Sequence, residues 1–217
     1  PDATLRTIRY DNGEWTIFTY NPSYILKKTV GPGQEWTYTQ LNSFYCVDGV
    51  VLSDTTYVMG QPVGGSGNWI VGKVNGNSVE TLYESTQANV GARLRALQTD
   101  GDNLYIFTDL VRTSSEQGGY YNNNAGQLIQ MCIIKIPGSV ASSATSPIDI
   151  TQYIHYKFPF VNKHGVYPAF QYGHDGYLYI GKNSVGGENS AEGNFEDGDD
   201  WSLIRVPTTG TLEHYTS

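Results

Sequence analysis

Residues 93–109 read RLRALQTDGDNLYIFTD and residues 126–138 read GQLIQMCIIKIPG, and these two stretches decide the fold. The first contains two short apolar runs around Asp100-Gly101, and an Asp-Gly dipeptide between such runs is a strong signal for a β-hairpin. The second is an apolar run that stops at Pro137-Gly138, because proline cannot donate to a strand ladder and glycine accepts a turn. The segment therefore predicts three antiparallel strands.

The same order of strand, turn, strand, loop and strand returns at three other places in the chain. The third and fourth copies align with each other as ALQ on AFQ, LYI on LYI and IKIP on IRVP. We expect four units, each with four antiparallel strands, at residues 4–42, 43–85, 92–156 and 165–217. In the second unit the first turn is predicted at Asp48-Gly49, and in the fourth unit at Asp175-Gly176.

Four copies of a unit too small to bury its own faces are typical of a β-propeller, in which blades pack face to face. A sandwich or barrel is the alternative, but it would have to be unusually large to hold sixteen strands. The predicted fold class is all-β, a β-propeller of four-stranded antiparallel blades, in a single domain over residues 1–217. Either four blades close the ring or they are consecutive blades of a larger one.

Composition narrows the partners of the chain. Its 217 residues carry a formal charge of −8, which argues against nucleic acid and anionic membranes, since both select for basic surfaces. No apolar run is long enough to insert into a membrane. The chain begins with Pro1, so we expect it to be a piece of a longer protein. The cysteines, Cys46 and Cys132, lie inside apolar runs, which favours buried free thiols over a disulfide.

The strand predicted over residues 14–20 is apolar on both faces. Trp15 and Ile17 alternate with Phe18 and Tyr20, and this pattern is expected of a strand stacked between neighbours.

The predicted loops differ between the two faces of the propeller. Tight turns lie on one face, whereas the long insertions, which lie on the other, contain many tyrosine and asparagine residues. Aromatic rings can stack on a sugar while amides bind its hydroxyls, so we expect a carbohydrate site there. A protein partner or a plain solvated surface is the alternative. The candidate ligand-binding residues are Arg95, Arg112, Tyr120, Tyr121, Asn122, Asn124, His164, Tyr167 and Tyr172.

No cofactor is expected. The acidic segment around Asp197, Asp199 and Asp200 has closely spaced oxygen ligands that suit Ca²⁺, but their order does not match an EF-hand loop. Solvated carboxylates are the favoured reading. The four histidines are scattered without metal-ligand spacing.

Four arginines on the predicted innermost strands raise an enzymatic alternative. Arg6, Arg9, Arg93 and Arg95 could bind a carboxylate, or could form ion pairs within the channel. The sequence DNGEW at residues 11–15 resembles a shortened form of the Asp-x-Gly-x-Thr-Trp turn of sialidases, which implies a glycan hydrolase. Only one turn carries the tryptophan, and no nucleophile pair can be located by spacing, so a non-catalytic domain is favoured.

An acidic propeller rich in Tyr, Asn and Gly resembles the receptor-binding domains of bacteriophage tail fibres and spikes. The resemblance implies adhesion to a surface glycan or polysaccharide at an extracellular or virion surface, often in a homotrimer formed through other parts of the protein. A secreted bacterial lectin or adhesin would share these features. The hypotheses are therefore a carbohydrate-recognition domain, a sialidase-like hydrolase and a protein-interaction propeller with a protein receptor.

Overall fold

The computed structural model describes residues 3–65, 67–85, 94–112, 121–122, 128–157, 169–182 and 202–210. The chain is all-β, and its four small antiparallel sheets are the blades of a β-propeller fold, which confirms the predicted fold class. It divides into two compact units. Unit 1 comprises Pro1–Glu84, Gly101–Asn103 and Pro137–Asp149, and unit 2 comprises Ser85–Asp100, Leu104–Ile136 and Ile150–Ser217.

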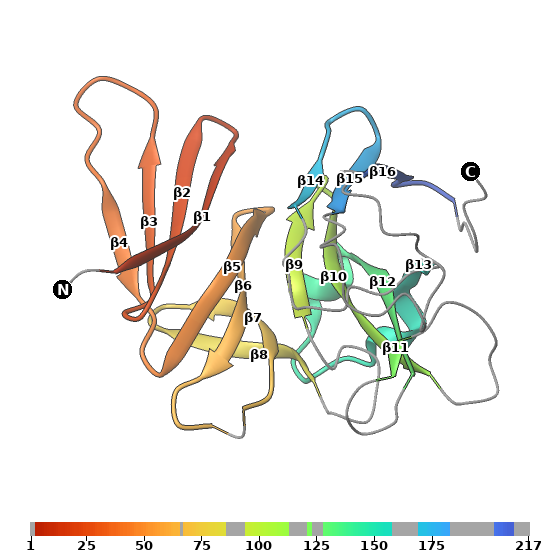
Figure 1. Ribbon diagram of the computed structural model, residues 1–217. Helices are drawn as coiled ribbons and strands as arrows, with labels where there is room; N and C mark the ends of the chain where they lie inside the picture. Colours follow the sequence, from red (N-terminus) through yellow and green to blue (C-terminus); the bar gives the residue numbers. More distant parts are fainter. Residues whose placement is uncertain are drawn as a thin grey trace. The chain divides into compact units, whose positions relative to one another are not determined.

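Unit 1 holds two four-stranded sheets whose strands pair in chain order (Figure 1). Sheet A consists of β1 (Thr4–Asp11), β2 (Glu14–Tyr20), β3 (Tyr24–Thr29) and β4 (Thr37–Gln40). Sheet B consists of β5 (Phe44–Leu52), β6 (Thr55–Pro62), β7 (Ile70–Asn75) and β8 (Ser78–Glu84).

One face of sheet A packs against sheet B. Phe18 and Ile25 from sheet A join a buried cluster with residues that include Cys46, Val58 and Ile70 of sheet B. Phe18 is fully buried, and its ring lies directly over Gly49, where a Cβ atom would overlap it. The two blades of unit 1 therefore share one apolar core.

The turn predicted at Asp48-Gly49 is wrong. Both residues lie inside β5, which continues to Leu52, and the chain reverses at Ser53 and Asp54. Ser53 and Asp54 have φ values of 48° and 63°, the conformation of a two-residue hairpin turn with positive φ at both positions. The Asp48 carboxylate is instead used by hydrogen bonds within unit 1, including one from the backbone N–H of Gly49 at 2.8 Å.

Unit 2 holds the other two sheets. Sheet C has the order β11-β12-β10-β9, and a further strand, β13, pairs with β12. Its strands are β9 (Leu94–Thr99), β10 (Asn103–Arg112), β11 (Tyr121–Asn122), β12 (Leu128–Pro137) and β13 (Ile154–Lys157). The described part of sheet D consists of β14 (Ala169–Tyr172), β15 (Tyr177–Lys182) and β16 (Ser202–Pro207). The fourth strand predicted for this blade lies outside the described residues.

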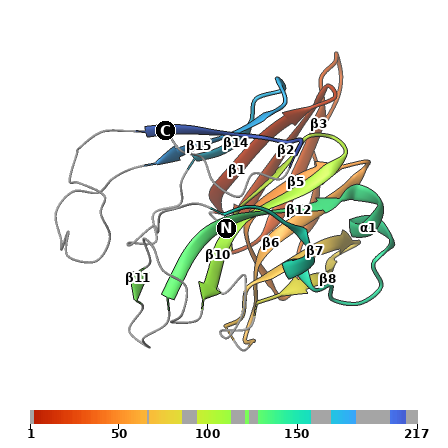
Figure 2. The same cartoon turned by 90° about the vertical axis from the view of Figure 1, so that its right-hand side faces the viewer.

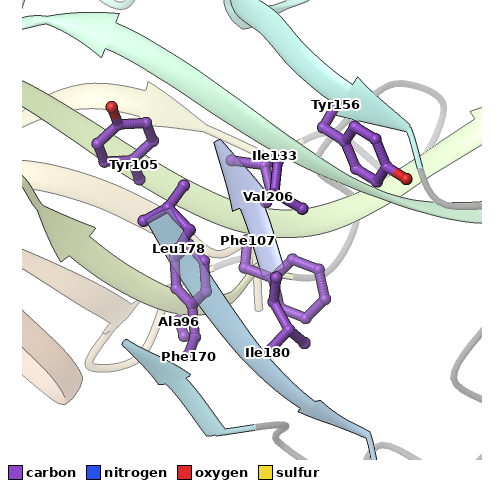
Figure 3. Close-up of a cluster of buried hydrophobic side chains, with 9 residues drawn as sticks. All are labelled: Ala96, Tyr105, Phe107, Ile133, Tyr156, Phe170, Leu178, Ile180 and Val206. Atoms are coloured by element: carbon purple, nitrogen blue, oxygen red, sulfur yellow. The ribbon is translucent and has the colours of Figure 1, made fainter. Parts of the chain in front are cut away.

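The core of unit 2 is formed by apolar side chains of both sheets, which point toward one another (Figure 3). Phe107 of β10 and Phe170 of β14 stack with ring centroids 5.5 Å apart. Ile180 and Val206, from β15 and β16, are almost fully buried in the same cluster. The two blades of this unit are therefore also held by a shared apolar core.

The connection after β12 contains a short helix, α1 (Gly138–Ser143), and a 3-10 turn, η1 (Ile150–Tyr153), where the sequence predicted strand and loop only. Figure 2 shows α1 near β7 and β8. The ammonium group of Lys73, on β7, donates to the carbonyl oxygens of Ser142 and Ala144 at 3.1 and 3.0 Å. A cation at a helix C-terminus satisfies carbonyl groups that have no partner within the helix.

Cys46 and Cys132 are free and buried, which confirms the predicted thiols. Burial, reinforced by the nearby Asp48 carboxylate, raises the pKa of the Cys46 thiol. Because the thiolate is the reactive form, Cys46 has the properties of an inert core residue.

Candidate ligand-binding site

Four of the nine predicted ligand-binding residues lie outside the residues that the structure describes. These are Tyr120, Asn124, His164 and Tyr167, and the calcium candidates Asp197, Asp199 and Asp200 also lie outside them. Arg112, Tyr121 and Asn122 belong to strands β10 and β11, but their side chains are not described. The loop site therefore stays a prediction.

Two predicted binding residues, Arg95 and Tyr172, are described in unit 2. Arg95 lies in β9 and is only 6% exposed. Tyr172 ends β14, is partly exposed and has its ring 5.0 Å from that of His174. The two side chains thus differ in access to solvent: Arg95 is buried, whereas Tyr172 is partly exposed and packs against the core cluster of unit 2.

Asp48 forms a polar cluster between sheets A and B in unit 1. Its carboxylate, in a residue only 7% exposed, accepts from the Thr7 hydroxyl at 2.8 Å and from the Arg9 guanidinium at 3.0 Å. Arg9 also donates through Nε to the carbonyl oxygen of Gly49 at 3.2 Å. Arg9 was predicted either to bind a ligand carboxylate or to form an ion pair within the protein. It does the second, because it binds Asp48 and joins β1 to β5.

A second polar cluster closes the first hairpin of sheet C. The Tyr105 hydroxyl, on a fully buried residue, donates to Asp100 at 2.6 Å, and Lys135 lies 6.0 Å from the Tyr105 ring centroid. Burial and the hydrogen bond to Asp100 raise the pKa of Tyr105. His155 bonds the carbonyl oxygen of Pro207 at 2.7 Å, and burial lowers the pKa of this histidine.

The same tyrosine-to-aspartate bond occurs in the next blade. Tyr179 donates to Asp175 at 2.6 Å, and this bond lowers the pKa of Asp175 and raises that of Tyr179. Asp175 also accepts from the backbone N–H of Tyr177 at 3.1 Å. In both blades of unit 2 the aspartate of the Asp-Gly turn is therefore held by a tyrosine of the following strand, which indicates a structural role.

The buried Tyr105 leads to a prediction for alkaline stability. Above pH 10, the ordinary pKa of tyrosine, the unfolded chain releases the Tyr105 proton while the folded chain retains it. The free energy of unfolding therefore falls as pH rises, with a contribution from this residue of at most about 1.4 kcal/mol per pH unit. We expect Tyr105→Phe to have a shallower decline than the wild type in urea unfolding at pH 9 to 11. Equal slopes for the two proteins would contradict the assignment.

The outer face of sheet A, which is turned away from sheet B, carries an aromatic surface. The strand register places Ile8, Ile17, Leu26 and Tyr38 in one row across the sheet, and pairs Tyr10 with Trp15 and Trp15 with Lys28 in the next row. Trp36 precedes β4 and lies against Lys28, whose ammonium is 5.7 Å from the indole centroid. We call this set of eight side chains the aromatic face.

The aromatic rings of this face are accessible. Tyr10, Trp15, Trp36 and Tyr38 are 55%, 41%, 43% and 75% exposed. Tyr10 and Trp15 lie 4.7 Å apart with their ring planes at 42°, and Tyr24 meets Tyr38 edge-on at 6.2 Å. Clusters of exposed aromatic side chains are uncommon on solvated surfaces and are more common on surfaces that contact another molecule.

The sequence did not predict the aromatic face. It predicted a ligand site on the long loops, which is not tested, and it predicted that residues 14–20 pack between neighbours, which is seen on the face that meets sheet B. The signal was present in the alternation of Trp15 and Ile17 with Phe18, because only one of the two faces packs on sheet B. Knowing which face remains exposed required the structure.

Among the described residues, no group of three or more His, Cys, Asp or Glu side chains could hold a metal ion. A search of the helices in the same part of the chain gives none that is long and apolar enough to cross a membrane.

No protein-family model matches the chain, and no curated protein sequence matches it. Two solved structures are similar: an acylaminoacyl peptidase in complex with Z-Gly-Gly-Phe-chloromethyl ketone and an acylaminoacyl peptidase of Pyrococcus horikoshii. Each is 10% identical over 99% of this chain, with TM-scores of 0.44 and 0.43. The chain covers 32% and 33% of their lengths, so it spans about a third of either protein. Similarity at this level assigns no activity to the chain.

Proposed function

We propose that the domain is a non-catalytic recognition module that binds a cell-surface carbohydrate. The observation that carries the proposal is the aromatic face of sheet A. Sugars have flat apolar patches of C–H groups that pack on aromatic rings, and tyrosine and tryptophan combine such a ring with a hydrogen-bonding group. Both residue types are present at this face as exposed side chains, among them Trp15 and Tyr38.

The described arginines favour recognition over hydrolysis. Arg9 is bound by Asp48, and the Arg6 guanidinium lies 4.8 Å from the ring centroid of Tyr20. Four arginines were predicted to be able to bind the carboxylate of a ligand, and two of them thus have partners within the protein. A recognition module of this kind fits the attachment domain of a tail fibre or an adhesin, at an extracellular or virion surface.

A protein receptor is the second candidate function, because exposed tryptophan and tyrosine are also enriched where proteins bind one another. The two candidates differ in the partner that the aromatic face selects. Pull-down from the host surface, before and after enzymatic removal of glycans, separates them.

A glycan array followed by titration calorimetry tests the carbohydrate proposal. We expect at least one surface glycan to bind, and Trp15→Ala to weaken that binding about tenfold or more, because a ring that is covered by ligand contributes on the order of 1–3 kcal/mol. Val63→Ala removes an exposed apolar side chain of unit 1 outside sheet A and is the matched control. Absence of binding to every glycan, or equal binding by Trp15→Ala and wild type, would contradict the proposal.

A further inference from the structure

We infer that the carbohydrate is acidic and that its carboxylate binds Lys28 on the aromatic face. The inference rests on the proposed function and names the chemical class of the ligand. Lys28 is flanked by Trp15, its partner in β2, and by Trp36. A sugar ring stacked on either indole would therefore bring a carboxylate substituent within reach of the Lys28 ammonium.

Charge is the first argument. Sheet A has four cationic side chains, and three of them face partners other than the aromatic face: Arg9 binds Asp48, Lys27 binds Glu14 at 3.3 Å, and Arg6 lies over Tyr20. Lys28 has the Trp36 ring, and no carboxylate contacts it among the described residues. In a chain with a net charge of −8, such a cation in the middle of an aromatic row is suited to an anionic ligand.

The form of the row is the second argument. Tyr10 and Trp15 make a continuous patch on one side of Lys28, and Trp36 lies on the other side. Apolar rings on both sides of a single cation match a ligand that has an apolar face and one negative charge. A uronic acid or a sialic acid has both features, whereas a neutral sugar leaves the cation unused.

The contrast with the opposite side of sheet A is the third argument. The cluster between sheets A and B consists of apolar side chains, among them Phe18, Ile25 and Val58. A second apolar sheet placed on the aromatic face would bury Lys28 without an anion, and an unpaired buried charge is strongly unfavourable. An occupant that supplies a carboxylate satisfies Lys28 and covers the rings at the same time.

The test uses oligosaccharides of galacturonic, glucuronic and sialic acid, each paired with its methyl ester. The ester keeps the ring and the linkage and removes the charge. By calorimetry we expect at least one acid to bind about tenfold more tightly than its ester at low salt, and the preference to shrink as salt rises, because salt screens charges near the surface. Lys28→Gln is expected to abolish this preference, and Lys28→Arg to restore most of it.

Lys27→Gln is the matched control, because Lys27 is the adjacent residue on the opposite face of the sheet. It should retain the preference for the acid.

Equal binding of acid and ester, or an unchanged preference in Lys28→Gln, overturns the inference. If the esters bind as well as the acids and Trp15→Ala weakens both, the inference fails while the proposed function stands. If no sugar binds, both fail. Sedimentation without sugar tests whether a second copy of the chain covers the aromatic face. If the protein self-associates and Lys28→Gln alters this self-association, the inference is overturned.

Discussion

Replacing Gly60 with alanine is expected to lower the free energy of unfolding by about 3 kcal/mol or more, which is at the upper end for overpacking of a well-packed site. Gly60 lies in β6 opposite Cys46, beside the bulge between Cys46 and Asp48. A Cβ atom at this position would overlap the carbonyl oxygen of Tyr45 and approach a ring carbon of Phe44 to 2.8 Å. Because the main obstacle is backbone, no side-chain rotation can relieve it, and the two strands would have to separate.

Urea unfolding followed by circular dichroism measures the change as a shift of the midpoint. Gly31→Ala is the control, since the added Cβ would meet only the Gln34 side chain, at an ordinary contact distance of 3.5 Å. It is expected to change the stability by no more than about 0.5 kcal/mol, as is usual at surface positions. Similar midpoints for Gly60→Ala and Gly31→Ala would contradict the close approach of β5 and β6.

Replacing Asp48 with alanine is expected to lower the free energy of unfolding by about 3 kcal/mol, because removing one partner of a buried ion pair leaves the other without compensation. The carboxylate accepts hydrogen bonds from the Thr7 hydroxyl, the Arg9 guanidinium and the backbone N–H of Gly49. The substitution therefore removes the carboxylate that joins β1 to β5 and leaves the partly buried Arg9 guanidinium without its counter-charge.

The control for Asp48→Ala is a substitution in another ion pair of sheet A, between Glu14 and Lys27. Glu14 and Lys27 are both partly exposed, at 3.3 Å from each other, and exposed pairs contribute at most about 1 kcal/mol. Glu14→Ala should therefore be much milder than Asp48→Ala in the same urea experiment. Equal effects of the two substitutions would show that burial of the Asp48 pair is not what stabilises the joint between β1 and β5.

The sequence predicted hairpins well where the turn dipeptide had no competing partner. Asp100-Gly101 and Asp175-Gly176 form the expected turns, and Gly101 and Gly176 have φ values of 95° and 86°. Asp48-Gly49 carries the same local preference but lies within a strand, because Arg9 and Thr7 from a neighbouring blade bind its carboxylate. Such a contact, 39 to 41 residues away in the chain, leaves no trace in a local pattern.

The helix α1 was missed for a related reason. Its sequence, GSVASS, is short and has serine at three of six positions, which predicts a loop. The helix has a tertiary partner, since Lys73 from β7 binds the carbonyl groups at its C-terminus. Short helices depend on tertiary contacts, and only the fold brings Lys73 to this position.

The loop residues predicted aromatic recognition of a sugar, and both the ligand and its place stay predictions. The aromatic face of sheet A could not be predicted, because a strand that is apolar on both sides looks the same in the sequence whether the second side is covered or open. For Trp15 and Ile17 the distinction depends on which side of sheet A meets Phe44 and Val58 of sheet B.

An NMR titration of the indole N–H resonances with the tightest-binding glycan from the array tests most directly whether sheet A binds the ligand. The signals are assigned with single Trp→Phe variants. If sheet A binds the glycan, the resonances of Trp15 and Trp36 shift together as the glycan is added, while that of Trp69, which precedes β7 in sheet B, stays in place. A shift of Trp69 with Trp15 and Trp36 unchanged would contradict the claim that sheet A binds the ligand.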